Sequence, residues 1–137
     1  MIRGIIDLIV DDVTASGLIG SVTRNGATKV KVYPVVAEPE TAKPYVTIRR
    51  TGQATAIMKG QAQEVDTPVF SITAYADKYK TCIDILNAIR NVIDDYSGTS
   101  NGIVFKRAWY INSEDFFDKD DDAFVITDTY TARIQPA

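Results

Sequence analysis

The chain has 137 residues, of which 45% are hydrophobic and 24% are charged. Both values are usual for a globular protein, and the length suits one domain, so we expect a single domain over residues 1–137. The net charge of −3 argues against a protein whose main task is to bind the phosphates of nucleic acid. The absence of histidine removes the commonest general base and the commonest metal ligand.

The first apolar stretch predicts an amphipathic helix over residues 2–15, ended by Ser16-Gly17. Three aspartates interrupt this stretch, so we expect neither a signal peptide nor a membrane span. Residues 17–27 contain three glycines and the pair Asn25-Gly26, which predicts a loop or a short turn.

A β-branched run predicts a strand over residues 30–36, where Pro34 indicates an edge position or a bulge. Residues 37–44 are a polar loop with two prolines. Alternating apolar and polar residues then predict strands over 45–51 and 68–75.

The connection at residues 52–63 has no strong periodicity and is longer than most hairpin links. Long loops on a rigid sheet often mediate recognition, and the alternative is an extended hairpin tip. Two arginines beside it, with Lys29 and Lys31 in the preceding strand, form either a modest basic patch or a plain solvated strand face. The candidate interface residues of this region are Arg49, Arg50, Ile57, Met58, Lys59 and Gln61.

The clearest helix covers residues 79–93, with Asp77 as its predicted N-cap. Cys82 lies in the apolar stripe of this helix, so we interpret it as a buried small side chain and not a reactive thiol. A lone cysteine forms no disulfide, which slightly favours a cytoplasmic protein. Strands over 103–111 and 124–134 follow. The order α-β-β-β-α-β-β predicts an α+β fold with a mainly antiparallel sheet and two helices packed on one face.

Residues 114–122 are predicted to be the turn between the last two strands. They contain six acids and one lysine and so carry −5, which leaves +2 for the rest of the chain. Asp118, Asp120 and Asp122 have the spacing that begins a calcium loop, but an alanine and a threonine replace its glycine and glutamate. We therefore expect a solvated charged turn and no defined metal site; loose attraction of a divalent ion is the alternative.

The same acidic segment has a second interpretation, as a contact surface. The charge separation makes the molecule dipolar, so the acidic end is suited to a basic surface on a neighbour. Two phenylalanines within the segment either belong to that interface or fold back onto the edge of the sheet. The candidate interface residues here are Phe116, Phe117, Asp118, Asp120, Asp121 and Asp122.

No residue pattern supports catalysis. A nucleophile cannot have a histidine base in this chain. The glycine pairs lack the strand-loop-helix setting and the lysine of a phosphate loop. The acids crowd into a turn and onto exposed helix faces, where they are poorly placed for preorganised chemistry. We expect no catalytic residue, no cofactor and no enzyme activity.

Five stretches together resemble one known family over nearly the whole chain. They are the helix Ile2 to Val13, the strand Lys43-Pro44-Tyr45-Val46-Thr47-Ile48, the strand Val69-Phe70-Ser71-Ile72-Thr73-Ala74-Tyr75-Ala76, the helical Ile85-Leu86-Asn87-Ala88-Ile89-Arg90, and the closing Tyr130-Thr131-Ala132-Arg133-Ile134. In these elements and their order the chain is similar to the tail terminator, or tail completion, proteins of long-tailed bacteriophages.

The resemblance implies a structural virion protein that forms a ring, typically of six copies. Such a ring caps the polymerised tail tube and offers a surface to the head connector, and it performs no reaction. The implied partners are further copies of the chain, the tube protein and the connector, with no recognition of nucleic-acid sequence and no membrane. The implied location is the virion tail or neck, after assembly in the host cytoplasm.

Two alternatives remain at this point. One is another neck or head-completion adaptor, or a minor tail protein, of the same class of particle. The other is a ligand-binding regulatory α+β module, which would need an apolar pocket with convergent polar groups.

Overall fold

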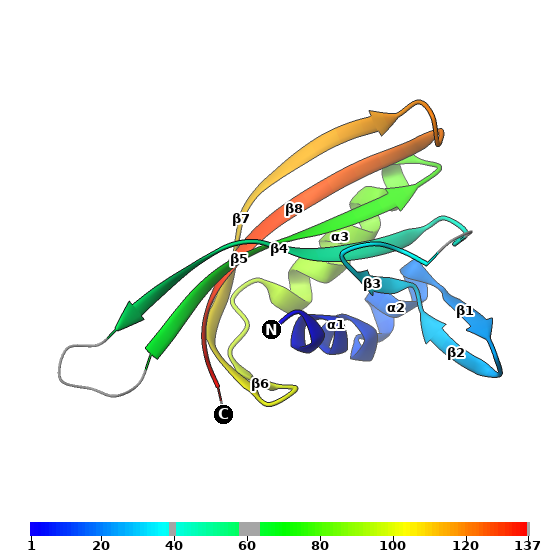
Figure 1. The fold of residues 1–137 in the computed structure, drawn as a ribbon. Coiled ribbons are helices and arrows are strands. Elements are labelled where there is room, and N and C mark those ends of the chain that lie inside the picture. Colours follow the sequence, from blue (N-terminus) through cyan, green and yellow to red (C-terminus); the bar gives the residue numbers. More distant parts are fainter. Residues whose placement is uncertain (39–40, 58–63, 137) are drawn as a thin grey trace.

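A computed structural model describes residues 1–38, 41–57 and 64–136 of the chain. Two short helices are followed by a hairpin, three strands, a third helix and three further strands (Figure 1). The elements are α1 (Ile2–Asp11), α2 (Val13–Ile19), β1 (Ser21–Arg24), β2 (Ala27–Val30), β3 (Val32–Pro34), β4 (Tyr45–Ile57), β5 (Glu64–Ala76), α3 (Tyr79–Ile93), β6 (Gly98–Ser100), β7 (Ile103–Asp118) and β8 (Ala123–Pro136).

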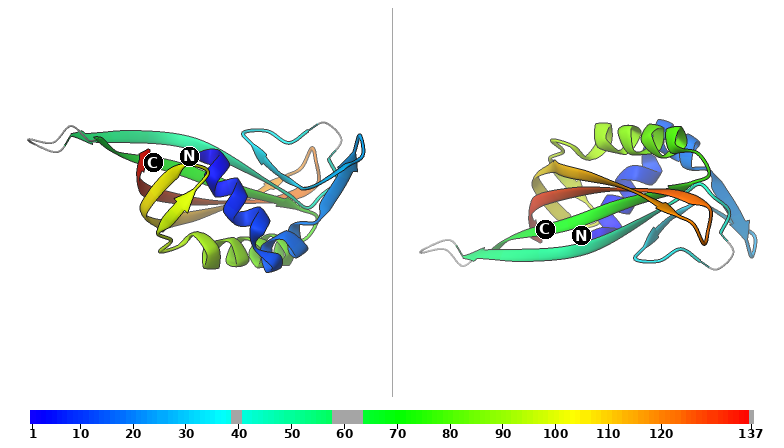
Figure 2. Two further views of the ribbon diagram at one scale, coloured as in Figure 1. Left: turned by 90° about the horizontal axis from the view of Figure 1, so that it is seen from below. Right: turned by 90° about the horizontal axis from the view of Figure 1, so that it is seen from above.

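The main sheet has six strands in the order β3-β4-β5-β8-β7-β6. Its neighbours are antiparallel except for the parallel pair β3 and β4. All three helices cover the same face of this sheet (Figure 2). The predicted α+β class and mainly antiparallel sheet are therefore confirmed, whereas the prediction of two covering helices is wrong because there are three.

The first helical region is divided at Asp12, where a single helix was predicted. Asp12 has an extended backbone, and its side chain accepts a hydrogen bond of 2.9 Å from the backbone N–H of Ala15. It therefore ends α1 and caps the start of α2, as aspartate does at many helix N-termini. The second helix continues beyond Ser16-Gly17 and ends at Gly20, whose positive φ of 84° suits glycine.

Close packing holds α1 against the strand β6. A Cβ at Gly4 would lie 3.0 Å from the carbonyl oxygen of Ser100 and 3.3 Å from the Phe105 ring. The Ser100 hydroxyl also donates a 2.8 Å hydrogen bond to the carbonyl of Gly4. Glycine at this position thus allows the helix to approach the end of the sheet.

The region predicted as a loop at 17–27 and a strand at 30–36 is built differently. Strands β1 and β2 form a small hairpin around Asn25-Gly26, both with positive φ, as a tight two-residue turn requires. Strand β3 is only three residues long. Pro34 ends it on the edge of the main sheet, so the predicted edge position is confirmed.

Two long hairpins extend the sheet further than the sequence patterns predicted. Strand β4 continues to Ile57 and β5 begins at Glu64, so much of the predicted 52–63 connection is strand. Strand β7 continues to Asp118, so the predicted 114–122 turn is mostly strand as well. The two hairpins point in opposite directions (Figure 1).

The hydrophobic core lies between the helices and the covered face of the sheet. Its largest fully buried side chains include Tyr130, Phe70 and Phe105, together with isoleucines from the helices and strands. Each fully buried isoleucine favours folding by about 1.5–3 kcal/mol relative to exposure. In the described parts of the chain, no helix has both the length and the apolar character needed to cross a bilayer.

Candidate interaction surfaces

The turn between β7 and β8 is a tight acidic loop over residues 119–122. Its conformation is fixed by Asp118, whose Oδ1 accepts hydrogen bonds from the backbone N–H groups of Asp120, at 3.0 Å, and Asp121, at 3.3 Å. Asp122 has a positive φ of 49°, which aspartate tolerates better than most residues. Of the acids predicted here, Asp120, Asp121 and Asp122 are exposed on the turn, and the half-buried Asp118 ends β7.

Lys43 fastens this turn to the rest of the fold. Its Nζ donates a 2.6 Å hydrogen bond to the carbonyl of Asp121, and lies 3.9 Å from the Asp121 carboxylate and 3.3 Å from that of Asp77. Asp77 was predicted to cap α3, but the N-cap position belongs to Lys78, with no side-chain capping bond. The Lys43 side chain thus links three connecting segments, namely its own before β4, the segment before α3 that contains Asp77, and the β7–β8 turn.

The calcium-loop spacing at Asp118, Asp120 and Asp122 does not produce a cluster of ligands. The Oδ1 atom of Asp118 already accepts hydrogen bonds from backbone N–H groups of its own turn. Over the described ranges 1–38, 41–57 and 64–136, no three cysteine or acidic side chains are placed to hold a metal ion. The acidic residues form a charged surface.

The two phenylalanines of the acidic segment have different environments. The Phe117 ring packs edge-on against Phe124, with 4.9 Å between centroids, and Phe124 in turn contacts Tyr79. Phe116, on the opposite face of β7, is 65% exposed. Local packing thus explains Phe117, and Phe116 remains an interface candidate.

Asp115 links the same cluster to α3. Its Oδ2 accepts a 2.7 Å hydrogen bond from the Tyr79 hydroxyl, and this bond raises the pKa of Tyr79 above its ordinary value. The far end of β7 is in this way held beside the first turn of the helix. The resulting shallow apolar hollow is lined by Tyr79, Asp115, Phe116, Phe117 and Phe124.

The basic candidates lie on β4. Arg49 and Arg50 are exposed, and Ile57 is the last residue of the strand. Met58, Lys59 and Gln61 lie outside the described residues. Lys31 does not extend this patch, because it is buried and its Nζ donates a 3.0 Å hydrogen bond to the carbonyl of Ala42.

A buried polar group that the sequence analysis missed lies between α3 and the sheet. Asp128 is 2% exposed; burial raises its pKa, while a Ser113 hydrogen bond and the Arg90 charge lower it. The guanidinium of Arg90 lies 3.6 Å from the centre of the Tyr110 ring. The signal was available, since Asp128 occupies a core position of β8, in phase with Phe124, Ile126 and Tyr130. These contacts fix the helix to β7 and β8.

Cys82 is fully buried, as predicted. Its Sγ lies 3.3 Å from the carbonyl oxygen of Phe124 and 3.6 Å from that of Ala74. Burial raises the pKa of the Cys82 thiol to about 11. Such a thiol stays protonated at neutral pH and is a poor nucleophile.

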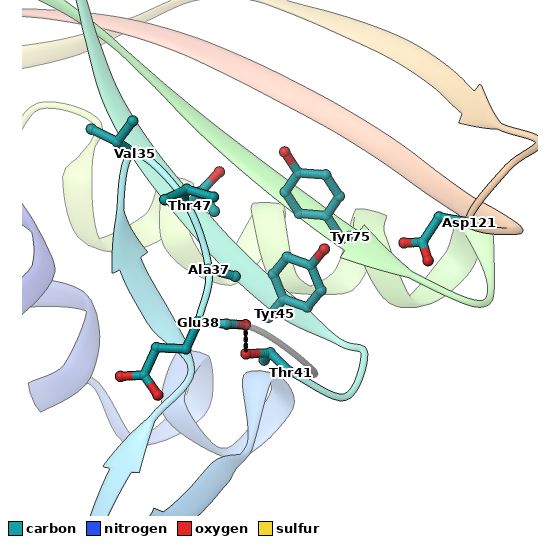
Figure 3. A pocket seen from close by; sticks show the side chains of 9 residues that line it. Val35, Ala37, Glu38, Thr41, Tyr45, Thr47, Tyr75 and Asp121 are labelled. Carbon is teal, nitrogen blue, oxygen red and sulfur yellow. Dashed lines mark hydrogen bonds between the residues drawn. The ribbon is translucent and has the colours of Figure 1, made fainter.

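A cavity of about 320 Å³ lies on the helix-free face of the sheet, beside residues 35–38 and Thr41 (Figure 3). The stacked rings of Tyr45 and Tyr75, 4.6 Å apart, form one side, and Asp121 lies beside them. The Thr41 hydroxyl, also at the cavity, donates a 2.5 Å hydrogen bond to the carbonyl of Glu38. The lining is more polar than the apolar pocket that a ligand-binding module requires.

Comparison with known proteins gives a match in structure only. No family model matches the sequence, and no curated protein sequence matches it. The chain is similar to one chain in the solved structure of the virion of a native gene transfer agent (GTA) particle, with a TM-score of 0.73 and 15% sequence identity. The match covers 96% of this chain and 92% of that chain. This likeness shows that the two chains share one fold over nearly their full described lengths.

Proposed function

We propose that this chain is a structural protein of a phage-like virion, and that it acts as a tail terminator. In this role it forms a ring that caps the tail tube and joins it to the head connector. The observation that carries the proposal is the fold shared with a chain of a GTA virion, along nearly the whole of both chains. The resemblance of the sequence to tail terminator proteins supports the more specific role.

The surfaces of the molecule suit such a role. A terminator must contact copies of itself and two different partners, and therefore needs several exposed surfaces of distinct chemistry. This chain offers an acidic hairpin turn, an exposed phenylalanine on β7, and an arginine pair on β4. Assembly, and not chemistry, is what these exposed groups support.

Deletion of the gene from the phage or prophage that encodes it tests the proposal. A cap that stops tube growth should, when lost, leave tails of uncontrolled length that do not join heads. Tails of normal length that fail to join heads would instead favour a head-completion or neck adaptor. Particles of normal length and normal joining would contradict both roles, and restoration of the gene is the control.

A further inference from the structure

One open edge of the main sheet lies along β4. Strand β3 pairs with this side of β4 only at Val46–Ile48, and the Val35 N–H then donates a 2.8 Å hydrogen bond to the carbonyl of Ile48. From Arg49 to Ile57, no other strand of the described structure pairs with this side. An unpaired strand edge offers backbone N–H and carbonyl groups to a further strand.

A second open edge lies along β7, at the opposite side of the sheet. Strand β6 pairs with β7 at residues 103–105, and the Asp94–Tyr96 segment contacts it at Ala108 and Tyr110. Beyond this point, from Ile111 to Asp118, no strand in the part of the chain that the structure describes pairs with the outer side of β7. Residues 111–117 are all exposed.

We propose that these two edges bind each other between successive copies of the chain, with Ile111–Asp118 of one copy antiparallel to Arg49–Ile57 of the next. The inference rests on the ring proposed above and names its contact. The two edges have similar lengths and opposite charge, because β4 carries two arginines whereas β7 and its turn carry the acids. Strands β4 and β7 are also antiparallel within one copy, so a neighbour related by rotation about the ring axis presents β4 in the required direction.

A specific register gives complementary side-chain pairs. β4 contains a bulge between Arg50 and Gly52. Full overlap of the two edges then places Arg49 opposite Asp118 and Gly52 opposite Phe116, all on the helix-free face. A Cβ added at Gly52 would have only Val69 within 4 Å, at 3.9 Å, so there is space beside it for the exposed Phe116 ring. Aromatic side chains stabilise strand glycines by covering them in this way.

The same register is compatible with a closed ring. Within one copy Asp115, Ile126, Ala74 and Val46 lie side by side across the sheet. In the proposed register Asp115 faces Gln53 of the neighbour, whereas within one copy it lies level with Val46. Allowing for the bulge, this is a shift of about six strand positions, or roughly 20 Å along the strands. The four strands of one copy span roughly 19 Å across the sheet. The strands would then be inclined by roughly 45° to the ring axis, close to the ~35–45° found in closed barrels.

Charge reversal across the proposed pair tests the contact. Arg49→Asp alone and Asp118→Arg alone should each weaken self-association at least about tenfold, because like charges then face each other. An equimolar mixture of the two variants, and the double variant, should recover association. The measurement is multi-angle light scattering with electron microscopy of the oligomers. Lys29→Asp controls for the charge change, and Asp118→Asn controls for the turn, because its amide oxygen keeps the hydrogen-bond acceptor.

A disulfide between copies gives a second measurement that does not depend on charge. The double variant Gly52→Cys/Phe116→Cys should form a covalent ladder of oligomers on mild oxidation, in solution and on purified particles. Within one copy strands β5 and β8 separate these two positions, so an internal bond cannot form. The buried Cys82 can remain in place, and each single-cysteine variant is the control.

The outcomes separate this inference from the proposed function. The edge contact is overturned, with the terminator role left intact, if both charge-reversal variants still form rings and the double-cysteine variant forms rings without a covalent ladder. A wild-type chain that stays monomeric at about 100 μM, and whose cysteine variant gives no ladder on particles, also overturns it. The terminator role itself is decided by the tail lengths after gene deletion.

Discussion

Cys82 shows how one buried side chain limits reactivity. With a pKa of about 11 in the folded chain, only about one thiol in a thousand is ionised at pH 8. We expect a maleimide or disulfide reagent to modify Cys82 at least about a hundredfold more slowly in the native protein than in urea. Thiol-labelling kinetics at pH 8 measure this, and rapid labelling without denaturant would contradict the buried position.

Asp128 gives stability a dependence on pH. Burial raises its pKa in the folded chain, so the native state keeps this proton to a higher pH than the unfolded state does. The native state therefore binds more protons between the two pKa values, and the free energy of unfolding falls as pH rises through that range. We expect the wild type to lose stability relative to Asp128→Asn as the pH rises above about 4, the ordinary pKa of an aspartate. Urea unfolding of both proteins at each pH measures the difference, and parallel pH profiles would refute it.

At the scale of elements, Asp12 connects two helices through one hydrogen bond. Asp12→Ala removes the acceptor for the Ala15 N–H, and we expect it to lower the free energy of unfolding by about 1 kcal/mol. Asp12→Ser should keep most of the stability, because serine is also a good N-cap. Equal losses in both variants, measured by chemical denaturation, would mean that the cap contributes nothing.

The phenylalanine pair on β7 separates folding from assembly. Phe117→Ala removes a ring that packs against Phe124, and we expect a loss of about 1 kcal/mol in stability of the monomer. Phe116→Ala removes an exposed ring, so we expect less than about 0.5 kcal/mol change in that stability but weaker self-association. Thermal unfolding and light scattering of the two variants measure both effects. A larger loss of stability in Phe116→Ala than in Phe117→Ala would show that Phe116 is the ring needed for folding.

These elements also show what the sequence could and could not predict. Strong periodicity correctly predicted α3 and the alternation of β8, because their apolar residues face one continuous core. The division at Asp12 could not be predicted in this way, since an aspartate on the polar side of a helix fits an unbroken helix equally well. The small residues from Gly52 to Ile57 carry little apolar alternation, so their strand pairing depends on β5.

The sequence indicated which residues form the acidic and aromatic surface, but not the strand and turn that arrange them. The acidic and aromatic segment was found from its residues alone, but a run of acids resembles a turn more than a strand. Phe116 and Phe117 are neighbours of the same type, and only the pleat of β7 places one on the helix-covered face and the other on the free face. The role of Lys43 depends on a contact with Asp121, which is distant in sequence.

At the scale of the whole molecule, charge should govern assembly. The contact proposed above joins an arginine of β4 to the acidic end of β7, and both groups lie in water, where salt screens them strongly. We expect self-association to weaken several-fold between about 50 mM and 500 mM sodium chloride. Light scattering at both salt concentrations measures this, and Arg49→Asp should reverse the trend because salt then relieves a repulsion. An association that strengthens with salt in the wild type would point to an apolar contact.

The opposite directions of the two long hairpins have a consequence for any ring that the chain forms (Figure 1). In the proposed contact two acidic β7 edges would repel each other, which favours copies joined in one orientation over mirrored pairs. Such a ring is polar along its axis. In the proposed ring the β4–β5 hairpins would lie at one rim and the acidic β7–β8 turns at the other, so a single polypeptide would present two unlike docking faces to the partners above and below it.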